Sequence, residues 1–236
     1  MAIAFVQATS GTNATGATST TATSAFSSSV VDGNSIIVGI ANDGANGSVT
    51  SVTDNFGNPY SKLTGGATSS VTAEIWGAFN VKGGASLVVT ANQGFNDGAI
   101  FAHEYSGIAV KPKAELEEAY NTGSGASMST SIDTTNSNDT LIFVVGEMDI
   151  VGSNSLTVGS GYSNFTTASS NVIRGAVQSK IATTAVAQTA DVTMNDQGGA
   201  SWRIAMVRLA GKKVDGIGNK QFSWTAGNNI SLSEIT

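Results

Sequence analysis

The feature that most constrains the fold of this 236-residue chain is an internal repeat. Six segments of the first half recur in the same order in the second half, and turn residues separate them in both. In the first half they are Ile3–Thr9, Ser19–Ser28, Ser35–Ala41, Val71–Val81, Ser86–Asn92 and Gly98–Gly107, and in the second Ala114–Asn121, Ser127–Thr134, Leu141–Gly146, Val172–Ala182, Ala190–Asp196 and Trp202–Gly211. An ordered recurrence of this kind indicates a duplicated structural unit.

Composition and alternation identify the repeated segments as strands. The chain favours Val, Ile, Thr, Ser and Gly, with 28 glycines and only 12% charged residues, and it uses few helix-forming residues. In Val71–Val81 the two faces of a strand carry Phe79 and Trp76 respectively, which indicates that both faces are covered. The runs Ile36–Ile40 and Leu141–Val145 are apolar throughout, as is typical of central strands in a sandwich.

We therefore predict an all-β fold, an antiparallel β-sandwich of jelly-roll or immunoglobulin-like type, in two tandem similar halves of about seven strands each. The expected domains are a first repeat at residues 1–110, a second at 111–211, and a C-terminal arm or edge strand at 212–236. Two separate sandwiches and one pseudo-symmetric unit both fit the sequence. The joint Ile108–Lys113 contains Pro112 and no flexible linker, so the halves must pack closely.

Charge and residue usage exclude several function classes. A formal charge of −6 with no Lys/Arg cluster disfavours nucleic acid, and the chain has no apolar run long enough for a membrane helix. The absence of cysteine excludes disulfides and thiolate zinc sites. Met1–Gln7 lacks the charged start and long apolar stretch of a secretory signal, and we expect a protein that never used one.

No catalytic constellation emerges from the sequence, and we expect a protein that is not an enzyme. His103 is the single histidine, its neighbour Glu104 points to the opposite strand face, and no serine is placed to complete a triad. A half-buried or surface histidine is therefore expected. The acidic group Glu115, Glu117 and Glu118 reads as a solvated strand, because a glycosidase needs two carboxylates across a cleft.

One segment invites comparison with calcium loops. Asp54, Asn55 and Asn58 offer side-chain oxygens at close spacing, but the full calcium-loop pattern is missing and the ion needs six to eight ligands. The same residues form a strong turn signal without any metal. We expect a structural turn and no cofactor, with calcium as the alternative.

Large side chains supply the remaining candidates. Trp76 and Trp202 are candidates for stacking on a sugar ring, although a core built from small residues also needs large ones to fill it. In the C-terminal segment, alternation makes four residues candidates for an interface with a neighbouring subunit: Phe222, Trp224, Ile230 and Leu232. The alternative is an edge strand of the chain's own sandwich.

With the repeat in view, the chain resembles a family of β-sandwich proteins that bacteriophages and bacteria encode, either unsignalled or displayed on surfaces. The resemblance covers residues 3–211 and is carried by Ile3–Gly11, Asp32–Val38, Ser51–Tyr60, Ala73–Asn80, Glu104–Gly107, Asp139–Val145, Gly159–Phe165 and Val207–Leu209. It implies a virion structural or adhesive module, such as a tail, fibre or capsid-decoration component, and supplies no catalytic residues to carry over.

These observations lead to three hypotheses. The first is a non-enzymatic structural protein of a phage virion that forms homo-oligomers and contacts other virion subunits. The second is a carbohydrate-binding or adhesion module that binds cell-surface glycans at a phage or bacterial surface, in an extracellular location. The third, a glycan hydrolase, has the least support because no acid/base pair emerges.

Overall fold

The computed structural model describes the backbone at residues 2–13, 20–43, 48–92, 97–110, 116–132, 140–149, 155–169, 173–183, 186–195, 200–212, 221–225 and 229–233. Side chains are described at the same positions except 155, 191, 193–195 and the last two ranges. The regular elements in these ranges are eighteen β-strands, which confirms the predicted all-β class. No helix in the described ranges is long and apolar enough to cross a membrane.

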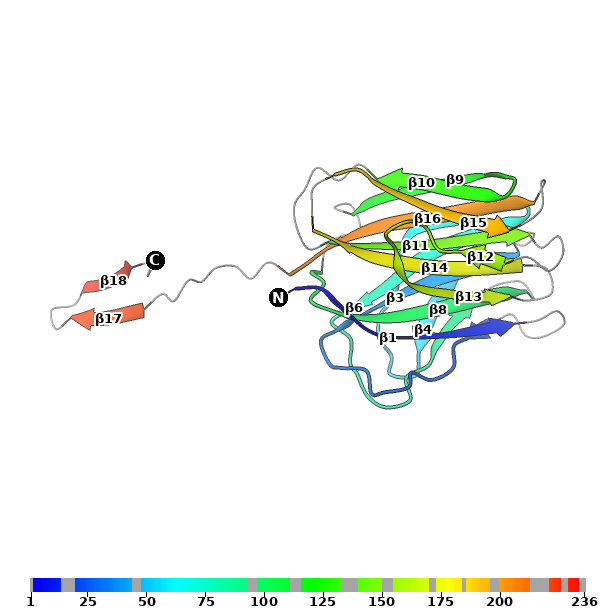
Figure 1. Cartoon of the computed structure of the whole chain (residues 1–236). Helices are drawn as coiled ribbons and strands as arrows, with labels where there is room; N and C mark the ends of the chain where they lie inside the picture. The colour runs from blue at the N-terminus through cyan, green and yellow to red at the C-terminus, as the bar shows by residue number, and fades with distance from the viewer. Residues whose placement is uncertain are drawn as a thin grey trace.

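The first half of the chain forms a larger and a smaller sheet (Figure 1). The five-stranded sheet has the order β1 (Ala4–Asn13), β8 (Gly98–Ser106), β3 (Ser35–Asp43), β6 (Val71–Phe79) and β5 (Ser61–Ala67). The three-stranded sheet has the order β2 (Thr20–Ala22), β7 (Val89–Asn92) and β4 (Ser51–Asp54). This is the strand order of a jelly roll, except that the fifth strand pairs with β6 instead of closing the smaller sheet.

The second half has the same strand order. Its five-stranded sheet runs β9 (Glu117–Ser124), β16 (Ser201–Ala210), β11 (Thr140–Asp149), β14 (Ile173–Ala182) and β13 (Ser163–Ser169). Its three-stranded sheet runs β10 (Ser127–Ile132), β15 (Gln188–Asn195) and β12 (Ser155–Thr157). All strand pairs in both halves are antiparallel, and residue 110 lies between the two sets.

The register of the central strands also corresponds. Val38 of β3 pairs with Ala102 of β8, and Val144 of β11 pairs with Met206 of β16. These are the pairs that the alignment of the two halves by sequence places at equivalent positions. Each half contains eight strands, where the sequence predicted about seven. The repeated segments named from the sequence do not cover β4 and β5 or their equivalents β12 and β13; β4 and β12 are only four and three residues long, and β5 and β13 each contain a register shift.

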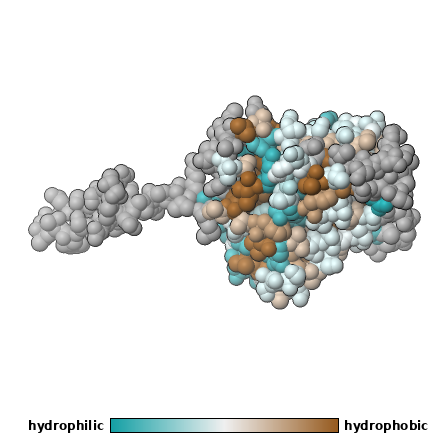
Figure 2. Space-filling view, in the orientation of Figure 1, coloured by the Kyte–Doolittle hydropathy of each residue, from teal (hydrophilic) through white to brown (hydrophobic). Residues whose placement is uncertain are grey.

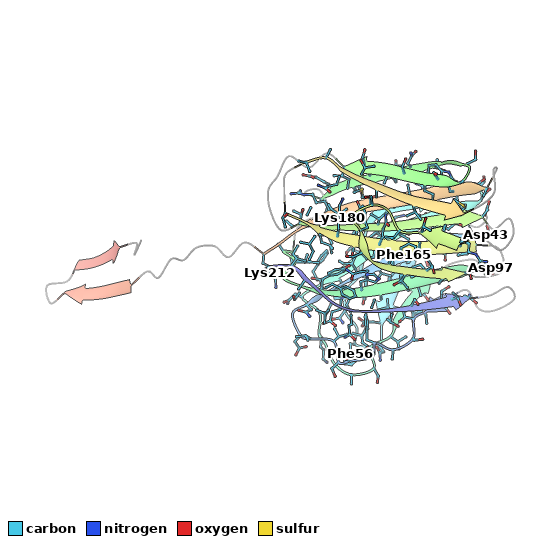
Figure 3. All side chains as sticks on the ribbon, viewed as in Figure 1. Asp43, Phe56, Asp97, Phe165, Lys180 and Lys212 are labelled. Atoms are coloured by element: carbon cyan, nitrogen blue, oxygen red, sulfur yellow. The ribbon has the colours of Figure 1, made fainter. Side chains whose placement is uncertain are left out.

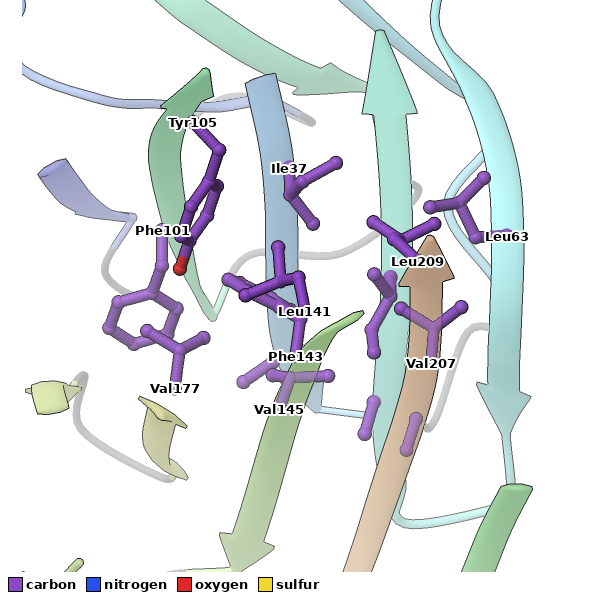
Figure 4. Close-up of a cluster of buried hydrophobic side chains, with 14 of the residues drawn as sticks. Ile37, Leu63, Phe101, Tyr105, Leu141, Phe143, Val145, Val177, Val207 and Leu209 are labelled. Atoms are coloured by element: carbon purple, nitrogen blue, oxygen red, sulfur yellow. The ribbon is translucent and has the colours of Figure 1, made fainter. Parts of the chain in front are cut away.

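The four sheets stack in layers of three, five, five and three strands. Side chains of β3, β6 and β8 pack on the first small sheet, and side chains of β11, β14 and β16 pack on the second. The opposite faces of the two five-stranded sheets pack on each other, and we call this contact the central interface (Figure 4). Its largest fully buried side chains include Ile37, Phe101 and Phe143, each of which contributes roughly 1.5–3 kcal/mol on burial.

The contacts across the central interface are arranged as in a two-fold symmetric dimer. Each strand of the first half is equivalent to the strand eight numbers later, and each contact across the interface has a counterpart in which the two halves exchange roles. β3 packs on β11, its own equivalent. The contact of β3 with β14 matches that of β11 with β6, and the further matched contacts are β6–β16 with β14–β8, β5–β16 with β13–β8, and β5–β9 with β13–β1. A contact of this kind is isologous, because each half uses the same surface. The two halves thus form a pseudo-dimer within one chain.

Close approach of the two sheets depends on small residues at the crossing of the central strands. A Cβ atom added at Gly39 of β3 would lie 2.5 Å from Cγ1 of Val177 and 3.2 Å from Cβ of Val145. A Cβ atom at Gly175 would lie 2.7 Å from Cβ of Ala41. Because interiors are close-packed, any added atom here must push the sheets apart.

We expect Gly39→Ala to lower the free energy of unfolding by about 1–3 kcal/mol, since its methyl group overlaps Val177. Val177→Ala alone removes buried methyl groups and costs roughly 2 kcal/mol. The double variant should lose less than the sum of the two, because each change makes room for the other. Urea unfolding measures all three.

A matched pair tests whether this coupling is local. Val192→Ala removes the same methyl groups from the core between the second pair of sheets, on the far side of β11 and β14. Its effect should add to that of Gly39→Ala. If the effect of Val177→Ala added to that of Gly39→Ala as fully as the effect of Val192→Ala does, the result would contradict the close approach of β3 and β14.

Candidate functional site

A buried polar network crosses one end of the central interface. His103 and Tyr105 of β8 meet Ser179 of β14: Nδ1 of His103 lies 3.2 Å from the Tyr105 hydroxyl, which donates a 2.8 Å hydrogen bond to Ser179 Oγ. Asn164 of β13 donates a second hydrogen bond of 3.0 Å to the same oxygen. The network therefore joins two strands of the second half to β8 of the first.

His103 is fully buried, so the expectation of a half-buried or surface histidine is wrong. Its ring packs edge-on against Phe5 of β1 and Phe143 of β11, at centroid distances of 5.6 and 5.3 Å. Burial lowers the pKa of His103 from 6.5 to about 3, so the ring is neutral at neutral pH. Because the Tyr105 hydroxyl donates to Ser179, it accepts from His103 Nδ1, and Nε2 is left without a partner.

This arrangement holds sheets together and lacks the geometry of a catalytic triad. The Ser179 hydroxyl oxygen accepts two hydrogen bonds, and no imidazole nitrogen is positioned to take its proton. Burial raises the pKa of Tyr105, so its hydroxyl stays neutral as well. No pattern in the sequence indicates this network, because its members come from strands that only the packing of the two halves brings together.

We expect His103 to make the protein acid-sensitive. The folded-state pKa lies below the unfolded value of 6.5, so the stabilisation is complete above pH 6.5. It is then lost, by up to about 1.4 kcal/mol for each pH unit, as the pH falls from 6.5 towards 3. Urea unfolding at a series of pH values should show this loss, and His103→Phe should remove it. An unchanged acid slope in the variant would assign the loss to other groups.

A cluster of carboxyl groups occupies the opposite end of the central interface. Asp43, at the end of β3, lies at the end of the body opposite Lys212, as Figure 3 shows. Glu147 near the end of β11 is fully buried, and neither carboxyl oxygen makes a hydrogen bond of good geometry. Burial and then the charges of Asp149 and Asp43 raise its pKa well above 4.5, against a smaller lowering by the Thr72 backbone N–H. The pKa of Asp149 is also raised, by burial and by Asp43.

Two other buried carboxylates have a full set of partners. Glu104 accepts hydrogen bonds from Asn34 Nδ2 (2.6 Å), Gln7 Nε2 (2.7 Å) and the Val31 backbone N–H (2.9 Å). Glu74 accepts from Trp76 Nε1 at 2.9 Å and forms an ion pair with Lys62 at 2.8 Å. Both face the core of the first half rather than the central interface. Glu147 differs from them because it has no such partners.

The calcium candidates form a hydrogen-bonded turn. Asp54 Oδ1 accepts from the backbone N–H groups of Phe56 and Asn58, and Oδ2 accepts from Asn58 Nδ2 and the Tyr60 hydroxyl. The side-chain oxygens of Asn58 and Asn55 accept from the backbone N–H groups of Lys82 and Val88. Among the described residues, no group of three or more His, Cys, Asp or Glu side chains has a geometry that holds a metal ion.

Calcium at this turn stays a hypothesis with a direct test. The side-chain oxygens of Asp54, Asn55 and Asn58 already accept hydrogen bonds from donors of the protein. We therefore expect the midpoint of thermal unfolding to be the same in calcium and in chelator. A midpoint that rises with calcium, and no longer does so in Asp54→Ala, would establish a calcium site here.

The tryptophan candidates for sugar stacking lie in the two sandwich cores. Trp76 is 8% exposed and Trp202 is 7% exposed, and each packs among the side chains of its own half. Trp202 also covers Gly123 of β9, where a Cβ atom would lie 2.6 Å from its ring. These positions leave little ring surface for a sugar.

A polar groove of about 510 Å³ lies beside the β9 and β10 edges of the second half. Its lining is Ala119, Tyr120, Asn121, Ser129, Thr130, Ser131 and Thr189. The Tyr120 side chain is 60% exposed, and the guanidinium of Arg203 lies 5.0 Å from the centroid of its ring. An exposed ring beside hydroxyl groups is compatible with a sugar, but the side-chain amide of Asn121 already bonds to Ser129 and Thr122.

The four interface candidates fall on the last two strands, β17 (Gln221–Thr225) and β18 (Asn229–Ser233). These strands pair with each other as a separate two-stranded sheet, in a register that places Phe222 opposite Leu232 and Trp224 opposite Ile230. The side chains of this segment lie outside the described residues.

Comparison with known proteins adds no relative. Neither protein-family models, nor curated proteins, nor solved structures include a match to this chain.

Proposed function

We propose that this protein is a non-enzymatic structural component of a bacteriophage particle, of the tail, fibre or capsid-decoration type. It acts through protein–protein contacts as a homo-oligomer or with other virion subunits, by docking its C-terminal hairpin onto a neighbour. The resemblance of residues 3–211 supports the virion context. The jelly-roll strand order supports it by fold-level analogy, because viral capsid proteins use this fold and lectins do too.

The observation that carries the proposal is the separate sheet formed by β17 and β18. Both large sheets are complete without these strands, since the body ends with β16 at Ala210. A two-stranded sheet is marginally stable in water unless it packs on another surface. The segment also contains four large apolar residues in eleven positions (Phe222–Leu232), in a chain that is otherwise rich in small ones. Contact with a neighbouring subunit would supply the missing surface.

The surface of the body suits contacts between subunits. Few charges lie on it, since only 12% of the chain is charged, and interface cores are depleted in charge. The face in Figure 2 carries apolar side chains in several small patches between polar ones. Partly exposed apolar residues include Phe5, Val6, Val110 and Ile181.

We expect deletion of residues 214–236 to abolish assembly and leave the fold of the body intact. Sedimentation and electron microscopy of the full chain should show a defined ring, trimer or filament, and the deleted chain should sediment as a smaller species. Circular dichroism and thermal unfolding measure the fold. Loss of folding in the deleted chain would instead make the segment an edge of its own sandwich.

Point variants separate docking from general effects of truncation. Trp224→Ala and Phe222→Ala should weaken assembly at least tenfold, whereas Ser223→Ala, between them on β17, should leave it unchanged. A full-length chain that remains monomeric and binds glycans on an array, with binding lost in Tyr120→Ala, would overturn the proposal in favour of a carbohydrate-binding module.

A further inference from the structure

Glu147 is the most isolated ionisable group in the described part of the chain. It follows the apolar run Leu141–Val145 on β11 and lies on the same strand face as Phe143 and Val145, which face the central interface. Its side chain is fully buried, and neither oxygen makes a hydrogen bond of good geometry, since the Thr72 backbone N–H acts on it only weakly. A buried carboxylate in this situation is strongly disfavoured, whereas the neutral acid is tolerated.

Among the residues that the structure describes, the groups around Glu147 supply no compensating positive charge. Asp149 follows two residues later on the same face, and Asp43 ends the equivalent strand of the first half, so the nearest charges repel an ionised Glu147. On β8's side, the Asp97 carbonyl accepts from the Asp43 backbone N–H. Arg203 of β16 pairs with Glu147 in register. Its guanidinium, however, lies over Tyr120 of β9, the strand that flanks β16 on the side away from β11.

The remaining strands that pack here present no cation to Glu147. On β6 the facing residues are small or apolar, Ala73 and Ile75, while Glu74 points away and is paired with Lys62 of β5. On β14 the facing position is Gly175; Arg174 pairs with Met148, whose side chain lies in the opposite core.

We propose that Glu147, Asp149 and Asp43 form a proton-operated latch, which holds the two five-stranded sheets together at this end while Glu147 is protonated and releases them when it ionises. The protonated acid is neutral and lets the sheets close. Ionisation places a third negative charge close to Asp149 and Asp43 at a position that is itself fully buried, and local separation of the strand ends relieves both costs. The inference does not depend on the proposed role in assembly.

The sign of the response follows from linkage. Glu147 holds its proton more tightly in the closed form than in the open one, where its pKa returns to about 4.5. The opening equilibrium at this end therefore rises up to tenfold for each pH unit above 4.5, and levels off once the closed form also loses its proton. At the other end His103 responds in the opposite direction, because opening there becomes easier as the pH falls below 6.5.

Hydrogen exchange of the full chain between pH 5 and pH 8 tests the latch. After correction for intrinsic exchange rates, amides near Asp43 and Glu147 should exchange faster as the pH rises, up to tenfold per unit. Amides near His103 should not exchange faster as the pH rises, and above pH 6.5 they provide the internal reference. Exchange near Glu147 that is independent of pH would overturn the proposal.

Variants identify the group responsible. Glu147→Gln keeps the shape without the titrating proton and should stay protected at pH 8, whereas Glu118→Gln, an exposed acid on β9, should behave as the parent chain. Asp149→Asn should reduce the response, because it removes one repelling charge. A response that persists in Glu147→Gln, or millimolar calcium that closes this end at pH 8 in the parent chain, would overturn the latch, the latter in favour of a cation site.

Discussion

The contact between the two five-stranded sheets is the constraint on which the rest of the structure depends. Each of these sheets is covered on both faces, by its small sheet on one side and by the other half on the opposite side. Their central strands must therefore be apolar at nearly every position, unlike strands of a simple sandwich with one solvated face. The closeness of the contact also requires small residues, of which Gly39 and Gly175 are the clearest because side chains of the other half occupy the space beside them.

Departures from the pseudo-two-fold symmetry explain why the first half packs better on the second half than on another copy of itself. Gly39 of β3 and Val145 of β11 occupy equivalent positions and meet at the crossing, so a pairing of identical halves would bring two glycines or two valines together there. Such a difference favours the intramolecular pairing, as interfaces with matched large and small residues do.

The sequence predicted those features that depend on local pattern. Alternation and turn residues indicate strands and the Asp54 turn, and the runs Ile36–Ile40 and Leu141–Val145 indicate burial on both faces. Pattern cannot identify what covers a buried face, so the burial of His103 escaped prediction. Glu147 left a readable signal, a carboxyl group directly after an apolar strand run, but its neighbour Asp43 belongs to the other half. The residues that pack on one face of a β-strand are far from it in the sequence. Sites between sheets are therefore the least predictable part of such a fold.

The two ends of the central interface share one physical requirement with opposite consequences. Between them lies a purely apolar contact that does not respond to protons, while each end holds a group that must be neutral for the sheets to close. A histidine is neutral at high pH and a carboxylic acid at low pH, so both ends are closed together only in an intermediate range. Buried polar groups at the rims also oppose sliding of one sheet over the other, because a shift would separate Tyr105 from Ser179. The apolar middle thus provides cohesion, and the polar ends define the register and respond to pH.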